Sequence, residues 1–352
     1  MRRLVLLFLG LAVLWGCQSP TERRAGPEPP AAPGSPWVSE VAAEHPLAGR
    51  VWRPAESRFV APGAVLADLQ GADFVLLGEK HDNADHHLIQ AWLLDALIAS
   101  GRRPAVAFEM LATDQRAPLE AHLAAHPRDA DGLAEAVAWA ESGWPDWSLY
   151  RPVFRAALVS PPGTPLLLLA ASLPRAKLRA VAREGVAALG SERGADLRLE
   201  ETLPGPEMAA LRREIARSHC DQMPESMIGP MVTVTRVKDA LMAETLVRGR
   251  GLAGTDGAVL IAGAGHVRAD RGVPWHLDRF APGASVVALG LLEVAVGQAE
   301  PASYAEAYGA DALPFDFVWF TPRVDDLDPC EAFGTQLEKA KQRHLQVPEG
   351  GE

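Results

Sequence analysis

Two short apolar runs in this 352-residue chain each end in the same pattern, Gly-x-x-His. The first run, residues 73–77, leads into Gly78-Glu79-Lys80-His81, and the second, residues 257–262, leads into Gly263-Ala264-Gly265-His266. Short aliphatic and β-branched runs that stop at glycine predict buried strands of an α/β sheet. Because ligands of such sheets collect at the carboxyl ends of the strands, we expect His81 and His266 to face one crevice.

Six apolar runs have the composition of strands, and helical stretches separate most of them. This alternation predicts an α/β fold with a mostly parallel central sheet flanked by helices. The last two runs are expected to add antiparallel edge strands. The predicted strands cover 73–78, 105–109, 166–171, 257–263, 285–294 and 315–320.

An amphipathic helix is predicted over 85–100, directly after the first histidine motif. Two longer stretches, near 112–160 and 173–250, are mostly helical and interrupt the predicted sheet. We interpret them as an inserted helical lid subdomain over the crevice. Candidate caps for the first helix are Asp82, Asn83 and Asp85.

The N-terminus has the features of a bacterial lipoprotein signal. Two arginines precede an apolar stretch over 4–15 that is too short to span a bilayer, and Leu14-Trp15-Gly16-Cys17 resembles a lipobox. We therefore expect Cys17 to be lipidated after cleavage; the alternative is an ordinary secretory peptide with an incidental cysteine. Gln18 is not the aspartate that usually retains lipoproteins at the inner membrane, which favours an outer-membrane anchor facing the periplasm.

Composition predicts one large domain on a tether. A hydrophobic content of 48% is ample for a core, and a net charge of −11 argues against nucleic acid and against a polybasic membrane face. Residues rich in Pro, Gly, Ala and Glu follow Cys17 and predict a flexible spacer. The predicted division is a signal peptide over 1–16, a lipidated tether over 17–50, an α/β domain over 51–335 and a polar tail over 336–352.

Two cysteines remain besides Cys17, namely Cys220 and Cys330. In an oxidising compartment such a pair is expected to form a disulfide; the alternative is two buried thiols. The chain contains no CxxC pair and no Cys/His spacing typical of a structural zinc site.

Polar residues at three predicted strand ends form a candidate site. Glu79, His81 and His266 come from the two motifs, and Glu109 ends the strand at 105–109. Two imidazoles and two carboxylates are predicted to hold a divalent metal ion or another polar ligand. The alternatives are that Glu79 caps the next helix, that His81 is a structural histidine, and that Glu109 pairs with a nearby arginine.

Several motifs together resemble the ChaN-like lipoproteins, a family described as haem-binding uptake proteins within the Tiki/TraB superfamily. The resemblance covers roughly residues 50–330. One stretch departs from it: where the family has Ala-Gln-x-x-Arg-Asp, residues 234–239 read Val-Thr-Arg-Val-Lys-Asp, and only Asp239 fits well. The motifs are Gly-Glu-Lys-His-Asp-Asn with His86-His87, Phe-Glu-Met at 108–110, Trp-Ser-Leu-Tyr-Arg-Pro at 147–152, His219-Cys220 and Gly-Ala-Gly-His-Val-Arg at 263–268.

The resemblance implies haem as the cofactor and suggests ligands for it. Tyr150 is a candidate for the iron because phenolate is a known haem ligand, and Trp144 and Trp147 lie near it in sequence. His219 could reach in from the lid, and Arg268 could bind a propionate. The alternatives are a core aromatic cluster for Tyr150, a helix-end histidine bonded to a carbonyl for His219, and a solvated surface arginine for Arg268. The implied cofactor-binding set is His81, Tyr150, His219, His266 and Arg268.

Two functions from different classes follow. The first is a lipid-anchored protein that captures haem, or another iron-bearing small molecule, for iron acquisition, with a homodimer shielding the macrocycle. The second is a metal-dependent periplasmic hydrolase of the Tiki/TraB type, acting on a peptide or ester. In the second, the metal is held by His81, His266 and either Glu79 or Glu109. The other glutamate acts as the general base.

Overall fold

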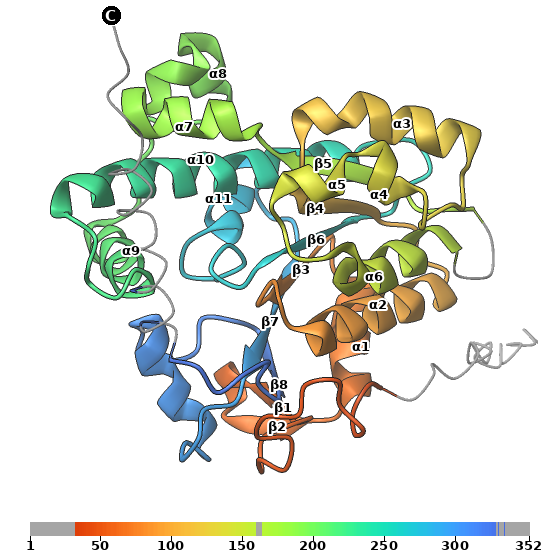
Figure 1. Cartoon of the computed structure of the whole chain (residues 1–352), viewed down its shortest axis with the longest axis vertical. Coiled ribbons are helices and arrows are strands. Elements are labelled where there is room, and N and C mark those ends of the chain that lie inside the picture. Colours follow the sequence, from red (N-terminus) through yellow and green to blue (C-terminus); the bar gives the residue numbers. More distant parts are fainter. Residues whose placement is uncertain (1–31, 160–163, 329, 331–333, 335–352) are drawn as a thin grey trace, which may run out of the picture.

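Eight strands of the described chain form one sheet, in the order β2-β1-β8-β7-β3-β6-β4-β5 (Figure 1). The computed structural model describes residues 32–159, 164–328, 330 and 334. The predicted signal peptide and Cys17 lie outside these residues, as does the tail from 336 onward. The strands are β1 Val51–Arg53, β2 Arg58–Val60, β3 Phe74–Glu79, β4 Ala105–Ala112, β5 Leu168–Ser172, β6 Ala258–Gly263, β7 Val286–Glu293 and β8 Phe317–Thr321.

Strands β3 to β8 pair in parallel, so the predicted mostly parallel α/β sheet is confirmed. The expectation of antiparallel edge strands at 285–294 and 315–320 is wrong. β7 lies between β3 and β8, and both of its pairings are parallel, because the segments before β7 and β8 are long enough to return the chain to the same end of the sheet. The antiparallel edge is formed by β1 and β2, whose three-residue length gave no apolar run to detect.

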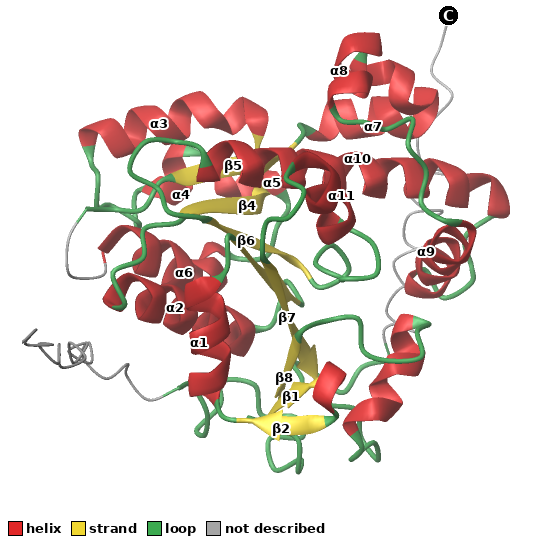
Figure 2. Ribbon diagram, turned by 180° about the vertical axis from the view of Figure 1, so that it is seen from behind, coloured by secondary structure: helices red, strands yellow, loops and turns green. Residues whose placement is uncertain are grey.

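Helices cover both faces of the sheet, giving three layers (Figures 1 and 2). Alternate residues of β3 serve the two faces: Val75 and Leu77 belong to one apolar cluster, and Phe74 and Leu76 belong to the other. The first cluster packs against α1 (Pro62–Gly71), α2 (Ala84–Ala99) and α6 (Trp147–Val159); the second packs against α10 (Glu225–Arg250) and α11 (Val273–Phe280).

The start of α2 is fixed by Asn83, one of the predicted caps. Its side chain accepts hydrogen bonds from the backbone N–H groups of Asp85 and His86. The same amide is buried and donates to Glu293 Oε1 at 2.9 Å and to the carbonyl of Pro322 at 3.1 Å. Asn83 therefore ties the loop after β3, which carries the first histidine motif, to the ends of β7 and β8.

The two helical insertions do not form one separate lid. Between β4 and β5, α6 packs on α2 and belongs to a covering layer; between β5 and β6, the C-terminal part of α10 packs on β4, β5 and β6. The helices α7 to α9 and the first half of α10 project beyond the sheet (Figure 1). The remaining insertion helices are α3 Arg116–Ala125, α4 Leu133–Ala136, α5 Trp139–Ser142, α7 Arg175–Glu184, α8 Ser191–Asp196 and α9 Gly205–Ser218. Within the described residues no helix combines the length and apolar character needed to cross a membrane.

A disulfide joins Cys220, just after α9, to Cys330, after the last strand, with 5.4 Å between the Cα atoms. This confirms the predicted pairing. Cys220 and Asp221 both have left-handed backbone angles, with φ of 57° and 53°, so the chain turns sharply at the bridge. The bond therefore fastens the segment that follows β8 to the projecting helical pair α9 and α10.

Replacing both cysteines by serine should destabilise the protein. The bridge closes a loop with a sequence separation of 110, for which chain entropy gives an upper estimate of about 4–5 kcal/mol. Urea unfolding should show Cys220→Ser/Cys330→Ser close to the reduced wild type, and both below the oxidised wild type. Equal stability of all three, or unlinked peptides in mass spectrometry of the unreduced protein, would contradict the bridge.

Candidate functional site

Three neighbouring strands carry the predicted site residues, although β4 continues to Ala112 and Glu109 lies within it rather than at the predicted strand end. β6 lies between β3 and β4, and Glu79 at the end of β3 is in register with Gly263 at the end of β6. Glu109 follows Phe108, which pairs with Ile261 of the same strand. The structure thus brings Glu79, His81, Glu109 and His266 together at the carboxyl edge of the sheet, where α/β folds bind their ligands.

The glycine of each Gly-x-x-His motif makes room for the other motif. A Cβ atom on Gly78 would lie 2.4 Å from Val267 Cγ2 and 2.9 Å from Ala264 Cα, in the loop after β6. A Cβ atom on Gly263 would lie 3.0 Å from His81 Nε2. Both motifs need glycine because the two loops pass each other at van der Waals distance.

Glu109 is the centre of the site. Its side chain is 1% exposed, and hydrogen-bond donors and cations from several elements surround it. The Gly263 N–H donates to Oε2 at 2.8 Å, and the Lys238 ammonium of α10 bonds Oε1. Burial alone would raise the pKa of the Glu109 carboxyl, but Lys238, His266 and His81 outweigh it and hold the pKa well below its usual range.

His266 is held between two carboxylates. Its Nδ1 lies 2.6 Å from Asp239 Oδ1, and its Nε2 lies 3.4 Å from Glu109 Oε1 and 3.3 Å from Lys238 Nζ. Burial and the neighbouring Lys238 disfavour the charged ring, yet Glu109 and Asp239 raise its pKa to about 9. At neutral pH the ring is an imidazolium that donates to Asp239 and faces Glu109.

His81 is the most accessible member of the cluster. Its side chain is 32% exposed and packs edge-on against Trp144, with 4.8 Å between ring centroids. Nδ1 lies 2.9 Å from Glu79 Oε1, which leaves Nε2 facing the space beside Glu109 Oε2, 3.9 Å away. Burial lowers the pKa of His81, but Glu79 and Glu109 together raise it above its ordinary value.

Glu79 is buried beneath His81 and fixes its orientation. Tyr150 donates its hydroxyl to Glu79 Oε1 at 2.8 Å, and His87 Nε2 lies 3.2 Å from Oε2. Burial would raise the pKa of Glu79, but His87 and His81 outweigh it and keep the group ionised. Glu79 thus acts on His81 from below rather than on a ligand.

Two of the predicted haem contacts are enclosed by other protein groups in this structure. Tyr150 is fully buried in the core beside Phe154, and burial and Glu79 raise the pKa of its phenol, so it serves Glu79 and presents no phenolate to a ligand. Arg268 is neither free for a propionate nor solvated. Its guanidinium is fully buried and bonds Asp270, Glu214 and the carbonyl of Tyr308.

His219 stands at the end of α9, where its Nδ1 lies 2.7 Å from the carbonyl of Ile215 in the same helix. This is the alternative given for His219 in the sequence analysis, a helix-end histidine bonded to a carbonyl. Of the two tryptophans near Tyr150, Trp147 packs against Phe154 and Trp139, and Trp144 alone reaches His81.

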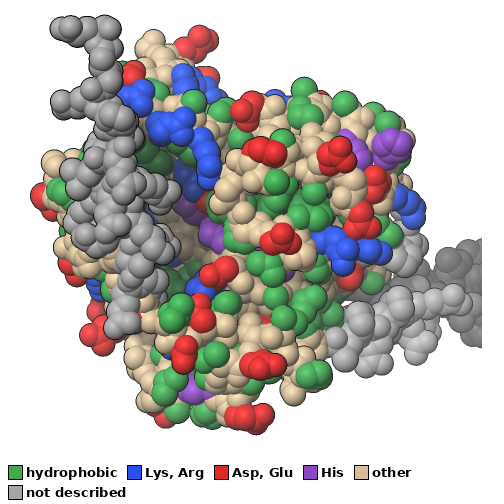
Figure 3. Space-filling model, viewed as in Figure 1, with side chains coloured by type: hydrophobic (Ala, Val, Ile, Leu, Met, Phe, Trp, Pro, Cys, Tyr) green, Lys and Arg blue, Asp and Glu red, His purple; other side chains and the backbone are tan. Residues whose placement is uncertain are grey.

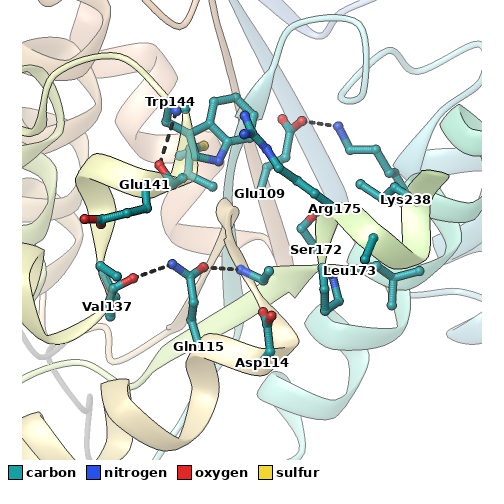
Figure 4. A pocket seen from close by; sticks show the side chains of 18 residues that line it. Glu109, Asp114, Gln115, Val137, Glu141, Trp144, Ser172, Leu173, Arg175 and Lys238 are labelled. Atoms are coloured by element: carbon teal, nitrogen blue, oxygen red, sulfur yellow. Dashed lines mark hydrogen bonds and ion pairs between the residues drawn. The ribbon is translucent and has the colours of Figure 1, made fainter. Parts of the chain in front are cut away.

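A cavity of about 500 Å³ opens beside Glu109 (Figure 4). Trp144, Arg175 and the ion pair of Glu109 with Lys238 lie at one end of it (Figure 4). Its size suits a small organic ligand. The space-filling view, drawn from the same side as Figure 1, shows a hollow in this face of the molecule. Histidine and basic side chains gather in and above the hollow (Figure 3). The polar lining residues are Glu109, Asp114, Gln115, Glu141, Ser142, Ser172, Arg175 and Lys238.

Lys238 and Arg175 are the functional candidates that sequence reasoning missed. The signal for Lys238 was available, since Lys238-Asp239 is a charged pair inside an otherwise apolar part of α10, between Val237 and Ala240. Asp239 itself is 4% exposed and orients His266. For Arg175 no signal existed, because an exposed arginine in a helix gives no indication of a ligand site by itself.

The predicted metal site is not formed. Within the described residues no group of three or more His, Cys, Asp or Glu is arranged to hold a metal ion. The physical reason is visible in the contacts: the Lys238 ammonium lies against both Glu109 and His266. Glu79 is not a candidate ligand either, because its carboxylate is fully buried under His81.

Comparison with known proteins gives a family and a fold. The family model described as haem-binding uptake, Tiki superfamily, ChaN, matches residues 65–277. A solved structure of cofacial haem binding to ChaN of Campylobacter jejuni is 21% identical with a TM-score of 0.57, covering 76% of this chain and 95% of that chain. A mutant erythromycin esterase in its open conformation is 16% identical over 66% of this chain and 72% of that chain, with a TM-score of 0.36 that carries no argument. No curated protein sequence matches.

The imidazolium of His266 should make stability fall with rising pH. Its folded-state pKa of about 9 lies above the ordinary value of 6.5, so its contribution is complete below about pH 6.5 and is lost as the pH rises to about 9. This difference corresponds to at most about 3 kcal/mol. In Asp239→Asn one carboxylate is gone, so the free energy of unfolding should fall less between pH 6 and pH 9.5.

The control is Asp82→Asn, which removes an exposed carboxylate of the loop after β3 that pairs with Lys80. Its pH dependence should parallel that of the wild type. If urea unfolding gives parallel curves for the wild type and Asp239→Asn as well, the charged pair of His266 and Asp239 does not exist.

Proposed function

Because the chain belongs to the ChaN family of haem-binding uptake proteins in the Tiki superfamily, we propose that it binds haem in the crevice at the ends of β3, β6 and β4. One observation carries the proposal: the His81 imidazole, oriented from below by a buried carboxylate, is partly exposed and packs against Trp144, which lines the cavity. An imidazole placed in this way is a common iron ligand of haem proteins.

The contacts of His81 suit coordination by Nε2. A neutral ring that donates its Nδ1 proton to Glu79 leaves the Nε2 lone pair free, facing Glu109 Oε2 at 3.9 Å across the crevice. A carboxylate partner on the other ring nitrogen also raises the basicity of the coordinating nitrogen. Since the pKa of His81 is raised, coordination at Nε2 competes with protonation of the ring up to a higher pH than for an ordinary histidine.

The cavity beside Glu109 is suited to the rest of the macrocycle. Trp144 offers an aromatic face, and Met110, Val137 and Leu178 add apolar surface. Arg175 supplies a charge for a propionate: it is exposed, and within the described residues its guanidinium makes no hydrogen bond or ion pair. Its guanidinium lies against Gly143, where a Cβ atom would clash with it.

The remaining candidates rank below His81. His266 is held by Asp239, Glu109 and Lys238, and Tyr150 is buried beneath Glu79. His219 would need to leave the end of α9. A haem bound at His81 would keep one face open to solvent, so a second copy of the chain is the partner we expect to cover it.

The cellular role follows from the N-terminus. We infer that Cys17 carries the lipid anchor, that a tether follows it, and that the body faces the periplasm from the outer membrane. The tether is shorter than the predicted 17–50, because the Val38 and Ser39 N–H groups bond Asp85 and Leu47 is buried in the core. In that position the protein would receive haem or another iron-bearing molecule during iron acquisition. The hydrolase alternative has less support, since the carboxylate expected to serve a metal is already paired with Lys238.

Haem titration tests the site. The wild type should shift the Soret band of hemin with a stoichiometry of one per chain, and His81→Ala should weaken binding at least tenfold or lose the His-ligated spectrum. His126→Ala, which removes an exposed histidine at the end of α3, is the matched control and should bind normally. Tyr150→Phe should retain the spectrum because the phenol acts only through Glu79.

The opposite pattern would reverse the assignment. If Tyr150→Phe loses the native spectrum and His81→Ala keeps it, the iron ligand is the phenol and Tyr150 must leave the core on binding. Absence of any Soret shift in the folded wild type would remove haem binding itself.

Lipidation is tested by Cys17→Ser. Without the thiol no acyl anchor can form, so this variant should stay unprocessed or leave the outer-membrane fraction for the soluble fraction. Palmitate labelling should mark the wild type and not the variant. Normal processing and unchanged fractionation of Cys17→Ser would show that attachment does not depend on this residue.

A further inference from the structure

The side chains around Glu109 are of the types that bind a divalent cation, although among the described residues they are not arranged as a metal site. The Nε2 atoms of two histidines lie 3.4 Å and 3.9 Å from the two oxygens of one carboxylate. In each ring the other nitrogen is bound by a carboxylate, Asp239 for His266 and Glu79 for His81. Two oriented imidazoles, one carboxylate and an outer shell of carboxylates are the usual components of a mononuclear metal site.

Two positive charges oppose a metal ion here: the proton that His266 carries at neutral pH and the ammonium of Lys238. The Lys238 ammonium lies against Glu109 Oε1 and 3.3 Å from His266 Nε2, so a positive charge already stands beside two of the three donors. Lys238 is held there by α10, in which the neighbouring Val237 is fully buried. Its side chain is 17% exposed, so the charge is largely shielded from solvent.

We propose that Lys238 is a metal-exclusion residue, whose ammonium keeps free divalent metal ions out of the donor set formed by Glu109, His81 and His266. A dication would have to displace an ammonium that bonds the central carboxylate, and it would meet the repulsion of that ammonium in a shielded site. The exclusion would make the crevice selective for a ligand whose metal is already enclosed in a macrocycle. That last consequence rests on the proposed haem function; the exclusion itself does not.

The test is to remove the charge and keep the shape. Lys238→Met retains an unbranched stem and leaves Glu109 its bonds to Gly263 and the two histidines. Each variant is titrated with cobalt(II) and zinc(II) at pH 8, where metal binding competes less with protonation of the rings. Calorimetry gives the affinity, and the visible absorption of cobalt(II) reports coordination by protein ligands.

The wild type should bind neither ion stoichiometrically, and Lys238→Met should bind one ion per chain at least 100-fold more tightly. Addition of His266→Ala to Lys238→Met should abolish this gain. Lys177→Met is the matched control, since it removes an exposed lysine of α7, and it should behave as the wild type. Lys238→Gln serves as a second variant if Lys238→Met does not fold by circular dichroism.

Two outcomes would overturn the proposal. One is stoichiometric binding by the wild type with the affinity of Lys238→Met; the other is a folded charge-free variant that binds no cobalt(II). A parallel hemin titration keeps the two proposals separate, because the wild type can fail to bind haem and still exclude metal, or the reverse.

Discussion

The buried Glu109 carboxylate is the group that holds the two halves of the site together. A charge in this position would be unstable alone, and it is compensated from three directions: by the Gly263 N–H of β6, by Lys238 of α10 and by the two histidine rings. Each partner comes from a different segment. The docking of α10 on the sheet and the path of both histidine loops therefore depend on one carboxylate in β4.

The sharing of one sheet edge by these strand ends could be predicted, because the end of each strand is visible in the local sequence. Apolar runs that stop at glycine indicate where strands end, and parallel strands bring their carboxyl ends to one edge, so Glu79, Glu109 and both histidines were expected to share that edge. The order of strands was not predictable from those runs. It depends on which faces of β3, β6 and β7 pack against which helices, and the edge strands β1 and β2 are too short to carry a periodic signal.

The errors share one physical cause, which is that burial of a polar side chain depends on tertiary contacts. The sequence shows a tyrosine among tryptophans and an arginine after a histidine, and both patterns fit ligand contacts equally well. Only the structure reveals that Tyr150 lies under Glu79 and that Arg268 is enclosed by Asp270 and Glu214. The site's own cation, Lys238, arrives from a helix about 130 residues beyond Glu109 in sequence, a distance over which no pattern carries information.

The buried Arg268 also explains why the two sides of the crevice differ. Through Glu214 it fastens α9 to the loop that follows His266, and Arg271 repeats the contact. His266, Asp239 and Lys238 therefore belong to one firmly braced body. His81 and Trp144 form the other side; His81 is partly exposed and contacts Glu79, the Tyr150 hydroxyl and the Trp144 ring. A ligand entering the crevice would meet a buried, charged wall on one side and a more exposed pair of rings on the other, and the exposed side carries the imidazole nitrogen that we propose as the iron ligand.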